Sequence, residues 1–539
     1  MSRQDALRPV DLASLSAVGT TRRRGEGLGY TAASTALLAI AFHVENASFV
    51  GLFALVPWLH AVERAGRIEA AALGGALGVG YGMASGYWIP DALQGLGAPG
   101  WASLAGWLVV CIWASTPVFV ALAVVARAVS ERSSHARVAA LCTAVFGVEW
   151  VVSTAWWGVP WNLLGYSQRG APGIAQLAVV AGVPGISVLP VGANTALGDA
   201  LQHRPRRGCL SLALVAAWGA LAFAGLPAAH ALRPPASADA SVDLLLIQPD
   251  LPRGERWIAK FQGLNLQRVQ RFVEHELASE EPGIGAILLP ENLLTTPLDE
   301  APELENDLRK WVDGLQIPVL TGLALDAADR SPLRYRSAVA WLEPGRGLTQ
   351  RLDKERAIPL LESTRRFPGD SALAHLFGDA ARWRKVEDGA GTEPLSGPVP
   401  VTPLLCYEVL FPALAAKRHT RESHAIVNLA DDSWVQGEAA THHLSEIARF
   451  RAIEQRSTLV RVAHGGWSLV VDPFGRITES LPLDRYASLR VAVRPQPPPT
   501  LGERAGLLAL PIGAGVLVWW LSSALGRVSR RTASTETRP

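Results

Sequence analysis

The chain has 539 residues, of which 49% are hydrophobic and 18% charged, and its formal net charge at pH 7 is +2. This length is too great for one ordinary core and predicts two or more domains. Lys and Arg form no stripe in the polar half, which argues against a nucleic-acid-binding protein, whereas the apolar composition with 18 Trp is typical of a chain with a membrane part.

Apolar runs dominate the N-terminal part, after a polar leader over residues 1–27. Each run is compatible with a membrane-spanning helix, and their centres lie near Leu37, Leu55, Leu77, Val109, Val145, Val183 and Val215. The long leader and the spans that follow argue against a cleavable signal peptide. We therefore expect a seven-span domain over 28–231, and an eighth span over 500–525 that contains the apolar run from Ala505 to Leu525.

Basic residues occur in alternate loops between these runs. The loops and tails that carry them contain Arg22, Arg23 and Arg24; Arg64 and Arg67; Arg127, Arg132 and Arg137; Arg204, Arg206 and Arg207; and Arg527, Arg530 and Arg531. The intervening loops carry a single basic residue, Arg169. Because short cytoplasmic loops retain Lys and Arg, we expect both termini, including the tail over 526–539, in the cytoplasm and the polar domain on the other side.

A linker rich in Pro and Ala over 232–241 leads into a globular domain over 242–499. Short β-branched or Leu-rich runs alternate there with amphipathic segments, which predicts an α/β domain. We expect helices over Phe261 to Leu277 and His442 to Arg456. The expected strands are Val242 to Ile247, Ala286 to Leu289, Val319 to Leu325, Ala338 to Leu342, Leu404 to Cys406, Ala425 to Leu429 and Leu459 to Val462.

Cys406 is the one cysteine of the globular domain, since Cys111, Cys142 and Cys209 fall in apolar runs. A disulfide framework is therefore not expected, and a lone thiol is a candidate nucleophile. Two further reactive residues follow predicted strands, Glu291 and Lys354. A carboxylate can take the thiol proton, and an ammonium can stabilise an oxyanion on an attacked carbonyl. Taken singly, each of the three also has an ordinary structural interpretation.

The order Glu, Lys, Cys, in the contexts Pro-Glu-Asn, Asp-Lys and Cys-Tyr-Glu, resembles the carbon–nitrogen hydrolase (nitrilase) superfamily. That resemblance implies a four-layer α-β-β-α sandwich. The sequences Gly158-Val159-Pro160-Trp161 and Gly165-Tyr166-Ser167-Gln168 resemble a loop of the apolipoprotein N-acyltransferases, which have eight spans with the nitrilase domain between the last two. The resemblance covers essentially the whole chain.

The same resemblance implies further site residues. Trp257, after Ile247-Gln248-Pro249-Asp250, matches an active-site Trp, and Glu362 matches a second carboxylate beside the Lys. Tyr407 and Glu408 match the residues after the nucleophile. The closing motifs match Asp432-Ser433-Trp434, the helix from Arg449 to Glu454, and Asp472-Pro473-Phe474-Gly475.

Three motifs depart from the family pattern. Ala430-Asp431-Asp432 replaces Ser-Asn-Asp, His464-Gly465-Gly466 replaces Asn-Thr-Gly, and Leu361-Glu362-Ser363-Thr364 replaces Gly-Glu-Tyr-Val. We interpret Asp431 and Asp432 as a loop pair rather than an acid/base dyad. His442 and His443 point about 100° apart on a helix and are not expected to bind a metal. No metal and no cofactor are predicted.

The resemblance implies an inner-membrane enzyme whose catalytic domain is periplasmic. It would move an acyl chain from a phospholipid, through a thioester on Cys406, to the α-amine of a diacylglyceryl apolipoprotein. An apolar loop around Leu360, Leu361, Phe367 and Leu373 would be its lid, and the chain is predicted to be a monomer. Two alternatives remain at this stage: a membrane-anchored amidase that transfers the acyl group to water, and a lipid-binding paralogue with a decayed site.

Overall fold

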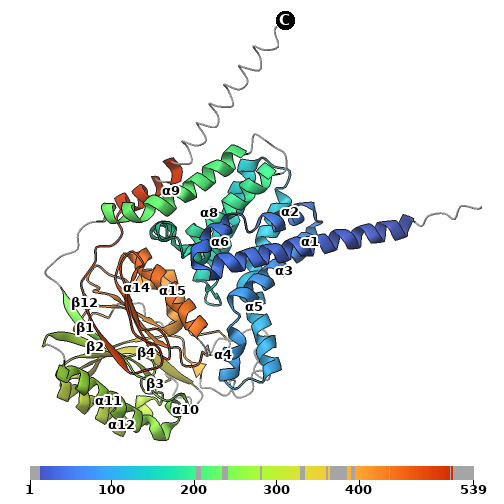
Figure 1. Ribbon diagram of the computed structural model, residues 1–539. Coiled ribbons are helices and arrows are strands. Elements are labelled where there is room, and N and C mark those ends of the chain that lie inside the picture. Colours follow the sequence, from blue (N-terminus) through green and yellow to red (C-terminus); the bar gives the residue numbers. More distant parts are fainter. Residues whose placement is uncertain are drawn as a thin grey trace, which may run out of the picture.

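Figure 1 shows the computed structural model, in which a set of helices adjoins a two-sheet domain. The structure describes residues 12–201, 208–233, 241–279, 282–327, 334–359, 362–363, 385–389, 395–435, 438–509 and 511–513. The helices precede the sheets in the chain, and the last described residues return to the helical part.

The helical part contains nine α-helices within the described residues. They are α1 (Leu12–His43), α2 (Val56–Arg64), α3 (Arg67–Ser85), α4 (Ile89–Gly95), α5 (Gly100–Ala128), α6 (Ser134–Thr154), α7 (Pro172–Ala175), α8 (Ala178–Leu201) and α9 (Gly208–Leu232). Glycines set the approach of α3 to α5. A Cβ atom added at Gly78 would lie 2.6 Å from the Thr116 Cα, and Gly74 and Gly82 are similarly close to α5. Small residues four apart on one face let two helix backbones touch, as is common in membranes.

In the described part of the chain, four helices are long and apolar enough to cross a membrane. They are Gly100–Ala128, Ser134–Thr154, Ala178–Leu201 and Ala213–Leu232. The expectation of eight spans is therefore met only in part. The run around Leu55 forms a 3₁₀ helix, Glu45–Leu52, and the nine-residue α2. A helix of that length extends about 14 Å, less than half of a bilayer core. Most of the predicted C-terminal span falls outside the described residues.

The second part contains two sheets. In the described residues the first has the order β12-β1-β2-β3-β4-β5, with β6 beside β4, and the second has the order β11-β10-β9-β8-β7. The strands of the first are β1 (Val242–Gln248), β2 (Ile284–Leu288), β3 (Val319–Asp326), β4 (Arg334–Glu343), β5 (Gly347–Asp353), β6 (Lys385–Val386) and β12 (Ala487–Val493). Those of the second are β7 (Thr402–Leu405), β8 (Ile426–Asp431), β9 (Leu459–His464), β10 (Leu469–Val471) and β11 (Ile477–Ser480).

The two sheets pack face to face, with helices on both outer faces (Figure 1). A core between the sheets joins side chains such as Leu246 and Leu288 to Val427 and Val462. Helices α11 (Gln262–Ser279) and α12 (Pro302–Leu315) cover the first sheet. Helices α14 (Pro412–Arg418) and α15 (Glu438–Gln455) cover the second, where one continuous core extends into the helical part. This is the α-β-β-α sandwich that the sequence predicted.

The seven predicted strands fall in β1 to β4 and β7 to β9, and both predicted helices lie in α11 and α15. Strands β5, β6, β10, β11 and β12 were not predicted. Strand β5 has the burial pattern of a half-exposed edge, and β11 exposes three of its four residues, so neither carries an apolar run. Sequence patterning misses strands that bury only one face, and β10, although fully buried, is only three residues long.

Candidate active site

Glu291 lies three residues after β2, where its side chain is 2% exposed. The neighbouring strand makes room for it. A Cβ atom on Gly322, in β3, would lie 2.6 Å from the Glu291 Cα. Ser337 Oγ, in β4, donates to Glu291 Oε1 at 3.3 Å. The carboxylate is therefore enclosed by β3 and β4 and points along the sheet edge.

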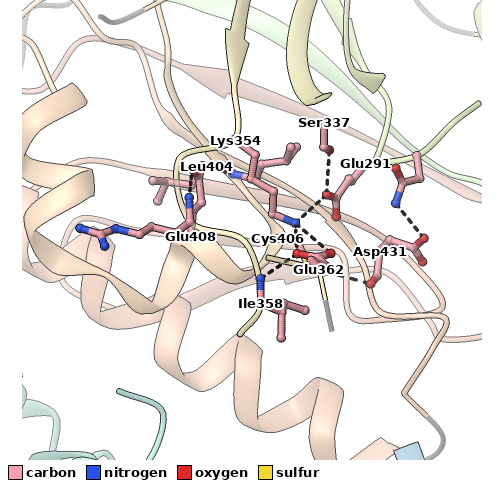
Figure 2. A network of polar contacts seen from close by, with 12 residues as sticks. Glu291, Ser337, Lys354, Ile358, Glu362, Leu404, Cys406, Glu408 and Asp431 are labelled. Carbon is pink, nitrogen blue, oxygen red and sulfur yellow. Dashed lines mark hydrogen bonds and ion pairs between the residues drawn. The ribbon is translucent and has the colours of Figure 1, made fainter. Parts of the chain in front are cut away.

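Lys354 follows β5 directly and is 1% exposed. Its backbone N–H donates to Ser337 O at 2.7 Å, which continues the ladder between β4 and β5. The ammonium donates to Glu291 Oε1 at 3.1 Å and to Glu362 at 3.0 and 3.2 Å (Figure 2). One buried cation thus lies between two carboxylates, as the resemblance predicted for Glu362.

Cys406 begins the 3₁₀ helix η7 (Cys406–Leu410), directly after β7. The predicted strand included this residue, but the chain turns there, and Cys406 has a φ of +46°. A side chain in the left-handed region is strained, and such residues gather at active sites. Its Sγ lies 3.9 Å from Asp431 O, at the end of β8. The turn places the thiol beside Lys354 and Glu362 (Figure 2).

Burial and charge set the protonation of this cluster. Burial raises the pKa of Glu291 to about 7, against the opposing effect of Lys354. Burial would lower the pKa of Lys354, but the Glu291 and Glu362 carboxylates outweigh it and hold that pKa well above its ordinary value. Burial and the Glu291 charge raise the pKa of the Cys406 thiol. The resting site therefore holds a neutral thiol, a cation and a carboxylate that takes up a proton near neutral pH.

Glu408 links the turn after Cys406 to the loop after Lys354. Its carboxylate accepts from Leu405 N at 2.9 Å, Glu355 N at 2.7 Å and Arg356 N at 3.3 Å. Arg418, from α14, donates to both oxygens at 2.6 and 3.0 Å. Burial would raise the pKa of Glu408, but Arg418 outweighs it and the pKa is lowered. Glu408 thus supports the turn at Cys406 and the loop after Lys354, and its lowered pKa favours the ionised carboxylate.

A pocket of about 500 Å³ opens beside the cluster. Its lining includes Glu291, Glu362 and two of the predicted supporting residues, Trp257 and Trp434. The Trp257 side chain is 46% exposed, so it stands at the mouth rather than in the floor. A substrate that reaches Glu291 through this pocket would therefore lie against one or both of these indole rings.

A second, apolar pocket of about 80 Å³ lies between the two parts of the molecule. Ile358, Tyr407 and Trp434 line it from the sandwich, and Ile358 and Trp434 line the larger pocket too. The helical part supplies the rest of its lining, which includes Trp88, Leu93, Val110, Trp113 and Trp161. The apolar pocket and the polar site thus share a wall.

The end of α6 and the loop after it contact the turn at Cys406 and the loop after Lys354. Tyr407 Oη donates to Gly158 O at 3.1 Å, and Arg356 Nη2 donates to Thr154 O at 3.2 Å. His443 Nε2 lies 2.6 Å from Trp161 O. The motif Gly158 to Trp161 therefore contacts Tyr407, the residue directly after Cys406, and joins the helical part to the sandwich.

Other predicted features fall elsewhere. Leu360, Leu361, Phe367 and Leu373, the expected lid, lie outside the described residues. The two adjacent aspartates do not form a loop pair, since Asp431 ends β8 and each has its own arginine. Arg256 binds Asp431 and Arg461 binds Asp432. In the described residues no group of three or more His, Cys, Asp or Glu could hold a metal ion.

Sequence reasoning missed two buried arginines, Arg256 and Arg418. The first stands directly before a predicted site residue, Trp257, and that neighbourhood is the one signal that could have found it. The second lies ten residues after Glu408, on a helix that the sequence did not predict. Nothing in the sequence pattern indicates that pairing.

An α-β-β-α sandwich with a buried Glu, Lys and Cys at one end is typical of the carbon–nitrogen hydrolase class, and residues 259–489 match the model of the Carbon-nitrogen hydrolase family. Residues 34–196 match that of the Apolipoprotein N-acyltransferase N-terminal domain. The chain belongs to the apolipoprotein N-acyltransferase family.

Full-length relatives carry the same family name. An apolipoprotein N-acyltransferase of Bradyrhizobium diazoefficiens is 28% identical over 99% of both chains. Another, of Brucella suis biovar 1, is 26% identical over 77% of this chain and 78% of its own. Among solved structures, an amidase from Nesterenkonia sp. covers 49% of this chain and 94% of its own, with 15% identity and a TM-score of 0.35.

Proposed function

We propose that this protein is a phospholipid-dependent apolipoprotein N-acyltransferase that works through a thioester on Cys406. The observation that carries the proposal is the buried Glu291, Lys354 and Cys406 cluster whose pocket shares a wall with an apolar pocket of the helical part. The family supplies the identity of the acceptor, a lipoprotein N-terminus, and of the donor, a membrane phospholipid.

In the first half-reaction Glu291 takes the Cys406 proton and the thiolate attacks an ester carbonyl of the phospholipid. Lys354 stabilises the oxyanion of the tetrahedral intermediate. The ester C–O bond breaks, the leaving alkoxide takes the proton from Glu291, and a lysophospholipid departs. The Glu291 pKa, raised to about 7, suits a group that must both accept and return a proton.

In the second half-reaction the α-amine of the S-diacylglyceryl cysteine attacks the thioester carbonyl. Glu291 takes a proton from the nitrogen, the C–S bond breaks, and the proton returns to the Cys406 sulfur. An amide forms and the enzyme is restored. A thioester that met water instead would be hydrolysed, so the site must exclude water while it waits for the amine.

The apolar pocket is suited to the acyl chain. Tyr407, directly after the nucleophile, lines it together with side chains from α4 and α5. The pocket is large enough for the first methylenes of the chain, which would bring the carbonyl to the polar site from the side of the helices. Holding both lipid substrates near one thiol would raise their effective concentration.

We further propose that the protein lies in the bacterial inner membrane with the sandwich in the periplasm and both termini in the cytoplasm. The alternation of basic loops supports this orientation. A reporter that is active only outside the cytoplasm should be on when fused near Ala236 and off near Arg206. The reverse pattern would make the lipoprotein unreachable and would favour the amidase alternative.

The proposal is tested with the purified chain in detergent micelles, a phospholipid and a diacylglyceryl lipopeptide. Cys406→Ala should abolish transfer, and Cys406→Ser should be nearly inactive, because a hydroxyl is a poor nucleophile at neutral pH. Cys111→Ala, which removes a buried thiol of α5, is the matched control and should keep activity. Transfer by Cys406→Ala would contradict the thioester mechanism, and release of free fatty acid without lipopeptide acylation would indicate an amidase.

A further inference from the structure

A buried arginine stands directly before Trp257. Arg256 is 2% exposed, and its guanidinium binds the Asp431 carboxylate through two parallel hydrogen bonds of 2.8 and 2.9 Å. Asp431 is also 2% exposed. Paired bonds of this kind fix the angle as well as the distance between two groups.

The same guanidinium reaches the turn that carries Glu291. Arg256 Nη2 donates to Asn292 O at 3.2 Å, and Asn292 Nδ2 lies 3.3 Å from Asp431 Oδ2. Asn292 has a φ of +55°, so this turn is held in a conformation that few residues adopt. Arg256 and Asp431 therefore tie the residue after Glu291 to the end of β8.

Asp431 also borders the nucleophile. Its backbone oxygen lies 3.9 Å from Cys406 Sγ, and it pairs with His464 across β8 and β9. Figure 2 shows Asp431 at the edge of the cluster, beside Cys406 and below Glu291 in this view. Asp431 and His464 are two departures from the family pattern, which usually has Asn at both positions, and the structure brings them together next to Arg256.

We propose that Arg256 and Asp431 are positioning residues that fix Glu291 relative to Cys406, a charged clamp in place of the neutral amide usual at position 431. This inference rests on the proposed function, because it takes Glu291 and Cys406 as the reacting groups. The clamp also places Trp257, the next residue, at the mouth of the pocket.

Stability alone does not account for such a pair, because a buried ion pair gains little over apolar residues of the same size. Removing one partner, however, leaves the other charge buried and unpaired. The charged groups that act on Glu291 are Lys354, Glu362 and Asp431, and Cys406 and Tyr335 titrate beside it. The two single variants should therefore move the pKa of Glu291 in opposite directions.

Arg256→Gln leaves the Asp431 charge without its cation, so the pKa of Glu291 should rise. Asp431→Asn removes a negative charge, so that pKa should fall. The readout is the rate at which iodoacetamide alkylates Cys406 in the full chain, followed by mass spectrometry of the Cys406 peptide across pH. The alkylation rate should fall on the acidic side of its pH profile, where Glu291 becomes protonated. The midpoint of that fall should move up by roughly one pH unit in Arg256→Gln and down by roughly one pH unit in Asp431→Asn. At higher pH, where the rate no longer changes with pH, each variant should react about tenfold more slowly or worse, because Glu291 is misplaced relative to Cys406.

The double variant Arg256→Gln/Asp431→Asn leaves no unpaired charge. It should therefore restore the parental midpoint of the pH profile and most of the alkylation rate at higher pH. Arg256→Lys keeps the charge without the paired hydrogen bonds. It should lower the alkylation rate at higher pH without raising the midpoint of the pH profile. Arg268→Gln, which breaks a half-exposed pair with Glu255, is the control and should match the parent chain. Thermal melting checks that each variant is folded at the assay temperature.

Shifts in the same direction for the two single variants, or a parental profile in both, would overturn the clamp. Alkylation does not depend on lipid transfer. A chain that showed the opposed shifts but never acylated a lipopeptide would therefore overturn the proposed substrate and leave the clamp standing.

Discussion

Two buried glutamates, Glu291 and Glu408, lie near Cys406, and they differ in what surrounds them. Glu408 accepts five hydrogen bonds, two of them from Arg418, and its pKa is lowered. Glu291 accepts two hydrogen bonds, from Ser337 and Lys354, and burial raises its pKa to about 7. One residue type thus serves as a fixed support or as a titrating base, depending on how many donors meet its charge.

The largest loss of activity is expected for a substitution at Glu291. Glu291→Gln should lower the rate of thioester formation by about 10²–10⁴-fold, because an amide cannot take the Cys406 proton. The melting temperature should change little, since a buried carboxylate with a raised pKa is not a stabilising charge. Single-turnover acylation and thermal melting measure the two effects. An unchanged acylation rate would remove Glu291 from the role of base.

Lys354 comes next in expected effect. Lys354→Arg should slow the first half-reaction by about 10²–10³-fold, because a planar guanidinium does not replace a compact ammonium at an oxyanion. The cluster keeps its positive charge in this variant, so the loss reports geometry. Burst-phase kinetics separate the two half-reactions. Thioester formation at the parental rate would place Lys354 outside the oxyanion site.

Glu408→Gln should mainly lower the free energy of unfolding. It leaves the Arg418 guanidinium buried without its counter-charge, which costs about 3–5 kcal/mol of unfolding free energy. Chemical denaturation in micelles measures this loss, with Glu291→Gln as the matched comparison. If Glu291→Gln destabilised the chain more than Glu408→Gln, the division between support and base would be wrong.

The smallest expected effect is the gradual change of the acylation rate with pH. The rate should fall about tenfold per unit below pH 7, because Glu291 with its raised pKa is then protonated and cannot act as a base. The lowered pKa of Glu408 has the opposite sign. Its stabilisation is present above the ordinary glutamate pKa of 4.5 and is lost only as pH falls through the lower folded value. Between about pH 5 and 7 the chain should thus lose activity and stay folded. Loss of both together would show that one titration governs them.

The sequence predicted seven of the strands, because most buried strands appear as apolar runs, and it singled out Glu291, Lys354 and Cys406. The family resemblance added Glu362. The prediction failed where the deciding partner is distant in the chain. Arg418 and Arg256 carry no pattern of their own, and Asp431 was placed in a loop because its pairing with His464 is a tertiary contact. The sequence also did not predict that the apolar run around Leu55 folds into two short helices instead of one long helix.

The central claim is that Cys406 carries the acyl group, and mass spectrometry of the intact purified chain tests it most directly. After incubation with phospholipid and without acceptor, the peptide that contains Cys406 should gain the mass of one fatty acyl chain. Hydroxylamine should remove that mass, since it cleaves thioesters, and the diacylglyceryl lipopeptide should discharge it. A Cys406 peptide that stays unmodified while the lipopeptide is acylated would contradict the account.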